Sequence, residues 1–178
     1  MVSGWLGADE RQVLLEAVDA GEWSNDLRRR VQQFGWRYDH RRRTVDRESF
    51  LGPLPGHLAP LAVRLADEGW AERAYDQIIV NEYLPGQGIA AHTDCVPCFG
   101  PSVASVSLTG ACEMVFDLPG SDERVPVWLE PGALLVMRGP GRDSWRHRIA
   151  ARNSDVRDGE AVPRSRRVSL TFRTVHLQ

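Results

Sequence analysis

The second half of the chain is a series of short segments in which residues of different character alternate, and this pattern constrains the fold most. One predicted strand begins at Gln77. Asn81 and Tyr83 lie on one face of this strand, and Val80 and Glu82 lie on the other. Glycine and proline separate this segment from those that follow. Short strands at such spacing are typical of a sandwich or barrel, and jelly rolls protect their edges this way. Further strands are predicted at residues 102–108, 113–117, 125–129, 133–137, 147–150 and 167–174.

The first part of the chain has helical rather than alternating periodicity. Residues 8–20 carry an apolar stripe that ends at Gly21, and a second stripe runs from Leu58 to a stop near Gly69. Residues 152–166 are polar and charged and predict a mobile loop. We therefore expect an α+β protein with a double-stranded β-helix (jelly-roll) core and N-terminal helices packed on one sheet. A length of 178 residues indicates a single domain, 1–178, divided into residues 1–75 and a core of residues 76–178.

Composition excludes several classes of protein. No apolar run approaches the roughly 20 residues that span a bilayer, and no secretory signal is visible at the start, so no membrane partner is expected. The formal net charge of −2 gives no global basic field, although every basic residue is arginine. Three cysteines provide no disulfide framework and fit a reducing cytoplasm. Cys95 and Cys98 lack the second pair that a zinc site needs, and are interpreted as ordinary loop thiols.

A His-x-Asp pair is the main candidate for chemistry. In an extended strand, His92 and Asp94 point to the same face and offer a nitrogen and an oxygen ligand side by side. Two histidines and one carboxylate, with other positions open, form the usual site for non-haem Fe(II) in oxygenases. His147 is the candidate third ligand. The alternatives are a chance His-x-Asp and a structural strand histidine.

The last predicted strand carries two arginines on a polar face. Alternation places Arg167, Ser169, Thr171 and Arg173 together, opposite apolar residues that can pack on helices or on the second sheet. Burying two guanidinium groups is costly unless anions neutralise them, and a dicarboxylate would do so. The alternative is an edge strand with two solvated arginines.

Together these segments resemble a known family. The His-x-Asp pair, the distal His147 and the final Arg-x-x-x-x-x-Arg motif are similar to those of the AlkB-like 2-oxoglutarate- and Fe(II)-dependent dioxygenases, as is Asn-x-Tyr-x-Pro-Gly-Gln-Gly-Ile before His92. The resemblance covers residues 81–173. It implies that residues 1–75 include a substrate lid and that Fe(II), 2-oxoglutarate and O2 are required. It assigns catalytic metal binding to His92, Asp94 and His147, and cosubstrate binding to Asn81, Tyr83, Arg167, Ser169 and Arg173, with Arg167 on the distal carboxylate.

The same resemblance implies the reaction. Decarboxylation of 2-oxoglutarate to succinate accompanies hydroxylation of a C–H bond, and a hydroxylated N-alkyl carbon leaves as an aldehyde. The expected substrate is a modified or alkylated base of DNA, RNA or tRNA, taken by a monomer. Trp36, Tyr38 and His40 are candidates to stack an extruded base, or they pack the helices onto the sheet.

Departures from the family pattern bear on the substrate. Repair members often have an acidic residue that helps select a cationic base where this chain has Val96, and Arg148 follows the distal histidine in place of glycine. Ser169 resembles instead the branch that hydroxylates a modified wobble uridine in tRNA. A small-molecule or protein substrate, and a catalytically silent jelly-roll binding protein, remain as alternatives.

Overall fold

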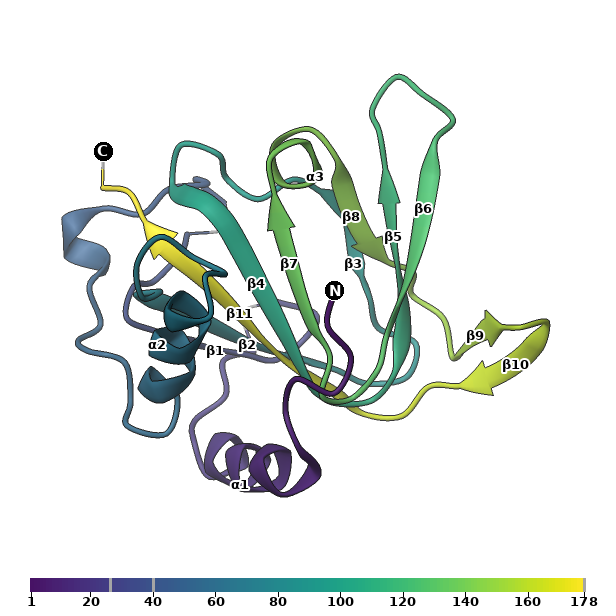
Figure 1. Ribbon diagram of the computed structural model, residues 1–178, viewed down its shortest axis with the longest axis horizontal. Helices are drawn as coiled ribbons and strands as arrows, with labels where there is room; N and C mark the ends of the chain where they lie inside the picture. Colours follow the sequence, from purple (N-terminus) through teal and green to yellow (C-terminus); the bar gives the residue numbers. More distant parts are fainter. Residues whose placement is uncertain (26, 40, 178) are drawn as a thin grey trace.

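The computed structural model describes residues 1–25, 27–39 and 41–177. Its β-strands form two main antiparallel sheets, with helices near the N-terminus (Figure 1). None of the helices in these ranges is both long and apolar enough to cross a lipid bilayer. In chain order the elements are α1 (Ala8–Asp19), β1 (Val31–Phe34), the 3-10 helix η1 (Arg47–Ser49), α2 (Ala59–Asp67), β2 (Gln77–Tyr83), β3 (Ile89–His92), β4 (Phe99–Thr109), β5 (Cys112–Asp117), β6 (Arg124–Leu129), β7 (Leu134–Arg138), α3 (Pro140–Asp143), β8 (Arg146–Ile149), β9 (Ser154–Arg157), β10 (Glu160–Pro163) and β11 (Arg167–Val175).

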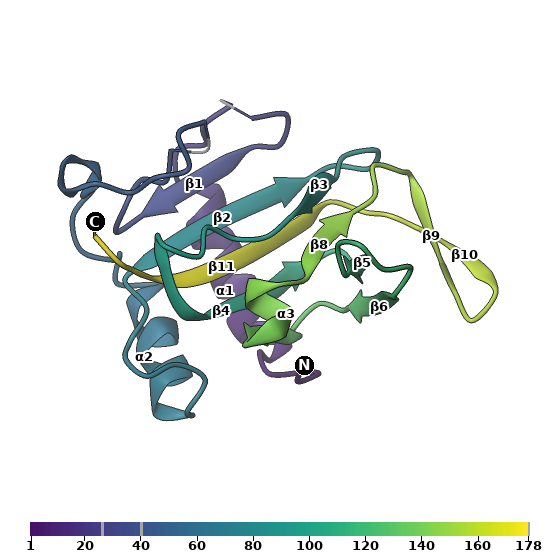
Figure 2. The same ribbon diagram turned by 90° about the horizontal axis from the view of Figure 1, so that it is seen from above.

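The two main sheets pack face to face, as in a jelly roll. The major sheet has the order β1-β2-β11-β4-β7, and the minor sheet has the order β3-β8-β5-β6. Apolar side chains of both sheets meet between them, for example Val103 and Met137 of the major sheet with Met114 and Phe116 of the minor sheet. Viewed from above, the strands of the minor sheet lie beside those of the major sheet (Figure 2). The predicted strands are therefore present, each within a few residues of its expected bounds.

The outer face of the major sheet is covered by the helices. Leu14 of α1 and Leu65 of α2 belong to one buried cluster with Val80 of β2, Val106 of β4 and Leu170 of β11. Full burial of an aliphatic side chain of this size stabilises the fold by about 1.5–3 kcal/mol. Because the apolar residues of β2 and β11 face the helices, the alternate, polar residues of these strands face the minor sheet. This division of faces creates the site described below.

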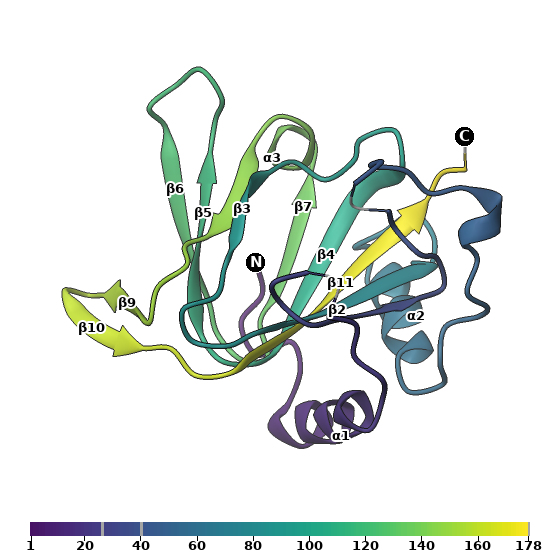
Figure 3. The same cartoon turned by 180° about the vertical axis from the view of Figure 1, so that it is seen from behind.

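Residues 152–166 differ from their prediction as a mobile loop. They contain a hairpin of β9 and β10 that extends from one end of the molecule (Figure 3). At its base the buried Asp155 accepts hydrogen bonds from Arg152 Nε at 2.7 Å and from Arg164 Nε at 2.7 Å. The prediction of a loop was wrong because ion pairs, rather than an apolar stripe, anchor this hairpin.

Replacing Asp155 by alanine should destabilise the protein strongly. The side chain of Arg164 is only 6% exposed, so the substitution leaves a buried guanidinium without its carboxylate. Breaking one side of such a pair costs about 3–5 kcal/mol, or a fall in melting temperature of roughly 6–20 °C for a chain of this size. Thermal unfolding followed by circular dichroism measures it. Asp122→Ala, at an exposed position before β6, is the control, and equal melting temperatures for the two variants would contradict the argument.

Candidate metal and cosubstrate site

A cavity of about 450 Å³ lies between the two sheets. The inward faces of β2, β11, β3 and β8 line it, together with segments on both sides of β1. Its volume falls within the range of about 300–1,000 Å³ that small-molecule sites occupy. Both sets of residues singled out from the sequence, the His-x-Asp group and the two arginines of β11, contribute to this one cavity.

The turn between β2 and β3 brings the two candidate histidines together. Gly86 has a positive φ of 85°, which favours glycine, and a Cβ added at Gly88 would lie 2.2 Å from the carbonyl oxygen of Ile149. The absence of a side chain at Gly88 therefore lets β3 approach β8 closely. In the resulting antiparallel register, His92 is the direct partner of His147.

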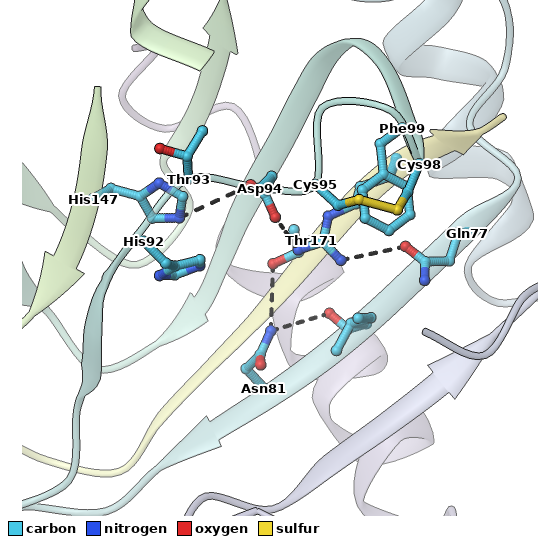
Figure 4. A network of polar contacts seen from close by, with 12 residues as sticks. Gln77, Asn81, His92, Thr93, Asp94, Cys95, Cys98, Phe99, His147 and Thr171 are labelled. Atoms are coloured by element: carbon cyan, nitrogen blue, oxygen red, sulfur yellow. Dashed lines mark hydrogen bonds and ion pairs between the residues drawn. A yellow bond between two sulfur atoms is a disulfide. The ribbon is translucent and has the colours of Figure 1, made fainter. Parts of the chain in front are cut away.

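His92, Asp94 and His147 lie side by side on the cavity wall (Figure 4). Nε2 of His147 is 4.0 Å from Oδ2 of Asp94, and the two imidazole centroids are 4.3 Å apart. Nδ1 of His92 is 2.8 Å from the carbonyl oxygen of Ala90, which leaves Nε2 of that ring for another partner. The arrangement thus offers two imidazoles and one carboxylate oxygen from neighbouring strands.

These side chains fit a metal ion, although they are not drawn tightly together. Two imidazoles and one carboxylate form the donor set that suits non-haem Fe(II), and with Nε2 of His147 and Oδ2 of Asp94 4.0 Å apart these residues would hold such an ion after moving closer together. Across the described residues, no three His, Cys, Asp or Glu side chains form a compact cluster of ligands. A bound ion would therefore draw His92, Asp94 and His147 closer to one another.

The electrostatic environment sets the protonation states that metal binding requires. Burial raises the pKa of Asp94, but the charge of Arg173 and those of the two histidines outweigh burial and lower this pKa to about 2. Burial lowers the pKa of His147 to about 4, against the opposing effect of Asp94. At neutral pH Asp94 is ionised and His147 is neutral. A carboxylate and a neutral imidazole are the forms that bind metals.

Arg173 supports the carboxylate of Asp94. Its Nη2 donates to Oδ1 of Asp94 at 2.6 Å, which leaves Oδ2 facing His147. Its Nη1 donates to Gln77, and its guanidinium lies 4.7 Å from the ring centroid of Phe99. These contacts from β2 and β4 fix Arg173 beside the metal-binding residues, at the end of β11 where the sequence predicted it.

Arg167, at the other end of β11, is a buried cation that lacks a carboxylate partner within the described residues. It is 3% exposed and donates to the carbonyl oxygen of Gly110 and the hydroxyl of Ser107, while its Nε is buried without a partner. A buried charge is costly unless an opposite charge compensates it. This unpartnered guanidinium in the cavity wall fits the carboxylate of a small acid.

The remaining predicted cosubstrate residues lie between these two arginines. Nδ2 of Asn81 donates to Thr171 at 3.3 Å, and Ser169 is the register partner of Asn81 on the adjacent strand. Burial raises the pKa of Tyr83, which keeps its phenol protonated and able to donate a hydrogen bond. The structure therefore gathers Asn81, Tyr83, Arg167, Ser169 and Arg173 along one cavity wall.

Of the candidate base-stacking residues, the two that the structure describes, Trp36 and Tyr38, pack on different aromatic partners. Tyr38 lines the cavity and packs on Phe99 with ring centroids 5.2 Å apart. Trp36 instead packs on Phe50 at 4.8 Å and does not belong to the described lining of the cavity. His40 lies outside the described residues. Of the two described candidates, Tyr38 is the one placed where it can contact a cavity ligand.

The interpretation of Cys95 and Cys98 as loop thiols was wrong. The two cysteines form a disulfide directly after Asp94, and both are buried. The turn between them sets their Cα atoms 5.3 Å apart, within the range that a disulfide requires. A count of three cysteines could not reveal this local proximity. Cys112 is a buried free thiol.

Arg142 is a residue that sequence reasoning missed. It lies in the short helix α3, is 2% exposed, and donates to the carbonyl oxygens of Cys95, Phe99 and Gly100 at 3.0–3.2 Å. Its guanidinium thereby ties the segment that follows Asp94 to the turn that precedes His147. An arginine in a Gly-Pro-Gly-Arg-Asp turn carries no sequence signal for this role.

Replacing Arg142 by methionine should weaken metal binding as well as stability. Each hydrogen bond from a charged donor contributes about 1.5–3 kcal/mol, and without these bonds the segment carrying Asp94 is no longer fixed relative to His147. We expect Co(II) affinity, measured by titration of the apoprotein, to fall about tenfold or more, as for residues that orient metal ligands. Arg142→Lys should recover part of the loss.

Arg138→Met is the matched control for this substitution. Arg138 is exposed and donates to the carbonyl oxygen of Gly69, away from the cavity, so its loss should leave Co(II) affinity unchanged. Wild-type Co(II) affinity in a folded Arg142→Met protein would show that Arg142 is purely structural.

Comparison with known proteins agrees with this geometry. Residues 16–173 match the sequence model of the 2OG-Fe(II) oxygenase superfamily. The chain is 34% identical over 189 residues to the alkylated DNA repair protein ALKBH8 homolog of Arabidopsis thaliana, covering 93% of this chain and 55% of that protein. It is 33% identical over 200 residues to the tRNA (carboxymethyluridine(34)-5-O)-methyltransferase ALKBH8 of Macaca fascicularis, covering 96% of this chain and 29% of that protein. The chain thus spans little more than half, or less, of these relatives.

Solved structures show the same fold. OsALKBH1 superposes with a TM-score of 0.69 at 18% identity, covering 96% of this chain and 93% of that one. A Pseudomonas putida prolyl-4-hydroxylase superposes with a TM-score of 0.56 at 13% identity, covering 99% and 91%. These matches confirm the jelly-roll core.

The family match also confirms the expected enzyme class and its requirements. Residues 16–173 match a family of 2-oxoglutarate-dependent oxygenases, and this family implies a requirement for Fe(II), 2-oxoglutarate and O2. With the buried unpaired Arg167 and the His92–Asp94–His147 group in one cavity, the chain belongs to the 2OG-Fe(II) oxygenase superfamily and is an AlkB-like member of it.

Proposed function

We propose that the protein oxidises a modified base of a nucleic acid, by hydroxylation or by oxidative demethylation. The observation that carries the oxidation chemistry is the single cavity that holds both a set of metal-binding side chains and the buried, uncompensated Arg167. The names of the relatives, which refer to repair of alkylated DNA and to a tRNA uridine, support a nucleic-acid base as substrate.

In this proposal each polar residue of the cavity has a distinct task. His92, Asp94 and His147 hold Fe(II), and Arg173 keeps Asp94 ionised and oriented. Arg167 binds the distal carboxylate of 2-oxoglutarate, with Tyr83 and Asn81 beside it. Iron with 2-oxoglutarate and O2 supplies the oxidation of a C–H bond. The chain itself supplies the orientation of these groups within one cavity between the two sheets.

The substrate would enter where Tyr38 lines the cavity. Enzymes that act on a base extrude it from its stack and hold it against aromatic side chains. Tyr38 is 9% exposed and is held by Phe99, so it presents a fixed ring edge rather than a mobile one. This position is consistent with a base entering opposite the metal-binding residues.

One assay tests the proposal. Anaerobically purified protein is given Fe(II), 2-oxoglutarate and O2 with single-stranded oligonucleotides that carry methylated or otherwise modified bases, and succinate and formaldehyde are measured. Succinate with equimolar formaldehyde indicates demethylation, and succinate with a hydroxylated base and no formaldehyde indicates hydroxylation. Asp94→Ala protein is the inactive control. Succinate formation that no nucleic acid stimulates would contradict the proposal and direct the search to small molecules or proteins.

A further inference from the structure

The outer part of the cavity carries three arginines that have no acidic partner among the residues the structure describes. Arg28, Arg29 and Arg43 all line it, and none of them forms an ion pair with a described residue. Their neighbours behave differently, since Arg30 pairs with Glu82 and Arg42 with Asp39. Arg37, Arg41 and Arg47 of the same stretch also form no ion pair with a described residue, but they do not belong to the described lining, so only Arg28, Arg29 and Arg43 present such groups to the cavity.

Two of these arginines are fixed on different sides of the cavity. Nε of Arg29 donates to Oδ1 of Asn81 at 2.9 Å, and its guanidinium carbon is 5.8 Å from the ring centroid of Tyr83. Nη2 of Arg43 donates at 3.2 Å to the carbonyl oxygen of Thr93, the residue between His92 and Asp94. The segments that carry them lie on the two sides of β1, in front of β2 and β11 (Figure 3).

The charge of the cavity exceeds what the cosubstrate can neutralise. Since the charges of Fe(II) and of the 2-oxoglutarate dianion cancel, they leave the balance of the lining unchanged. A cleft lined by charges of one sign attracts ligands of the opposite sign and repels those of its own. In the described lining, one carboxylate, that of Asp94, stands against the guanidinium groups of Arg28, Arg29, Arg43, Arg167 and Arg173.

We propose that Arg28, Arg29 and Arg43 form an anion subsite that binds a negatively charged group of the substrate, a carboxylate or a phosphate, beside the reacting base. This inference rests on the proposed function. Guanidinium groups bind both anions through paired hydrogen bonds. The same subsite discriminates against bases that carry a positive charge, such as N-methylated adenine or cytosine. Val96 contributes no counter-charge, because it is apolar and 47% exposed.

Direct binding measurements test the subsite. Full-length protein is loaded with Mn(II) and 2-oxoglutarate without O2, so that no turnover occurs, and is titrated calorimetrically with four probes. These probes are uridine, carboxymethyluridine, uridine 5′-monophosphate and the cationic 1-methyladenosine. We expect at least one anionic probe to bind about tenfold or more tightly than uridine, and 1-methyladenosine to bind most weakly. The preference for the anion should shrink as salt is added.

The anionic probes distinguish the source of the charge. Tight binding of carboxymethyluridine alone assigns the subsite to an acidic group on the base, and tight binding of the monophosphate alone assigns it to the nucleic-acid backbone. Tight binding of both shows a subsite that accepts either anion. Equal binding of 1-methyladenosine and the anionic probes, or no binding of either anion by protein that binds 2-oxoglutarate, would overturn the inference.

Substitutions test which arginines bind the anionic group. Arg29→Gln and Arg43→Gln should each lower affinity for the preferred anion about tenfold and leave uridine binding unchanged, while Arg29→Lys should retain most of it. Arg43→Gln leaves the Asn81 contact intact, so its 2-oxoglutarate affinity should equal that of the wild type. Arg124→Gln removes one exposed charge outside the cavity and is the control.

Unchanged anion affinity in both glutamine variants would overturn the subsite. Succinate formation with modified oligonucleotides tests the proposed function separately, because that assay does not use the nucleoside and nucleotide binding probes. The subsite and the proposed function can therefore fail separately.

Discussion

Arg167→Leu should raise the 2-oxoglutarate concentration needed for half-maximal turnover by about a hundredfold or more, with little loss of stability. Removing one partner of a buried charge pair costs about 2–5 kcal/mol in binding, Arg167 has no carboxylate partner among the described residues, and in our proposal the cosubstrate supplies one. In the apoprotein, which lacks the cosubstrate, the same substitution should have little effect on stability. There Arg167 is a buried cation whose Nε has no hydrogen-bond acceptor among the described residues, so an apolar side chain removes a desolvated charge.

Two measurements separate the binding role of Arg167 from a structural one. The first is the dependence of succinate formation on 2-oxoglutarate, and the second is the melting temperature of the apoprotein. We expect a large shift in the first and a change of only a few degrees in the second, since the lost bonds to Gly110 and Ser107 offset the relief of burial. Arg124→Leu, an exposed position outside the cavity, should change neither. A large fall in melting temperature with unchanged 2-oxoglutarate dependence would make Arg167 a structural residue.

The strands and the cavity wall could be predicted because each depends on a strict period of two. In β11, Leu170 and Phe172 pack under the helices, which forces Ser169, Thr171 and the two arginines into the cavity. A shift of the strand register by one residue would turn every side chain of the strand to the opposite face. The local pattern thus showed which residues of β11 share a face, but it left open whether that face lines a cavity or meets solvent.

The same rule failed where the chain leaves a regular strand. Trp36 and Tyr38 are two residues apart and would share a face in a continuous strand, but β1 ends at Phe34. Trp36 then pairs with Phe50 while Tyr38 packs on Phe99, so the two rings have different partners although Trp36 packs against the buried cluster that contains Tyr38. Loop geometry of this kind depends on distant contacts that alternation does not contain.

Residues held by polar contacts were also missed, for a different reason. Arg142 is buried through bonds to backbone carbonyl oxygens, and Asp155 through bonds to two arginines. Their sequence environment looks solvent-exposed, because hydrophobic periodicity reports only apolar burial. Both residues nevertheless lie at positions that shape the molecule, Arg142 beside the metal-binding segment and Asp155 at the base of the hairpin.

His92→Ala should abolish Fe(II) binding while leaving the fold intact. His92 is the register partner of His147 and lies on the same wall as Asp94, so it completes the only set of two imidazoles and one carboxylate in the described lining of the cavity. Loss of a residue that merely orients a ligand lowers metal affinity about 10–100-fold, and loss of a ligand should cost more. Its ring is partly exposed and bonds only to the carbonyl oxygen of Ala90, so little stability depends on it.

Metal-dependent stabilisation provides the cleanest measurement of this effect. A ligand present at a hundred times its dissociation constant stabilises the folded state by about 2.7 kcal/mol, which for this chain corresponds to a rise in melting temperature of roughly 5–10 °C. Wild-type protein should show that rise with Co(II) or with Fe(II) under anaerobic conditions, and His92→Ala should show none. His57→Ala is the matched control, because His57 packs against Phe34 at a centroid distance of 6.4 Å and does not line the cavity. An undiminished rise in the His92→Ala protein would remove this histidine from the site, because the remaining pair, Asp94 and His147, would then be binding the metal without it.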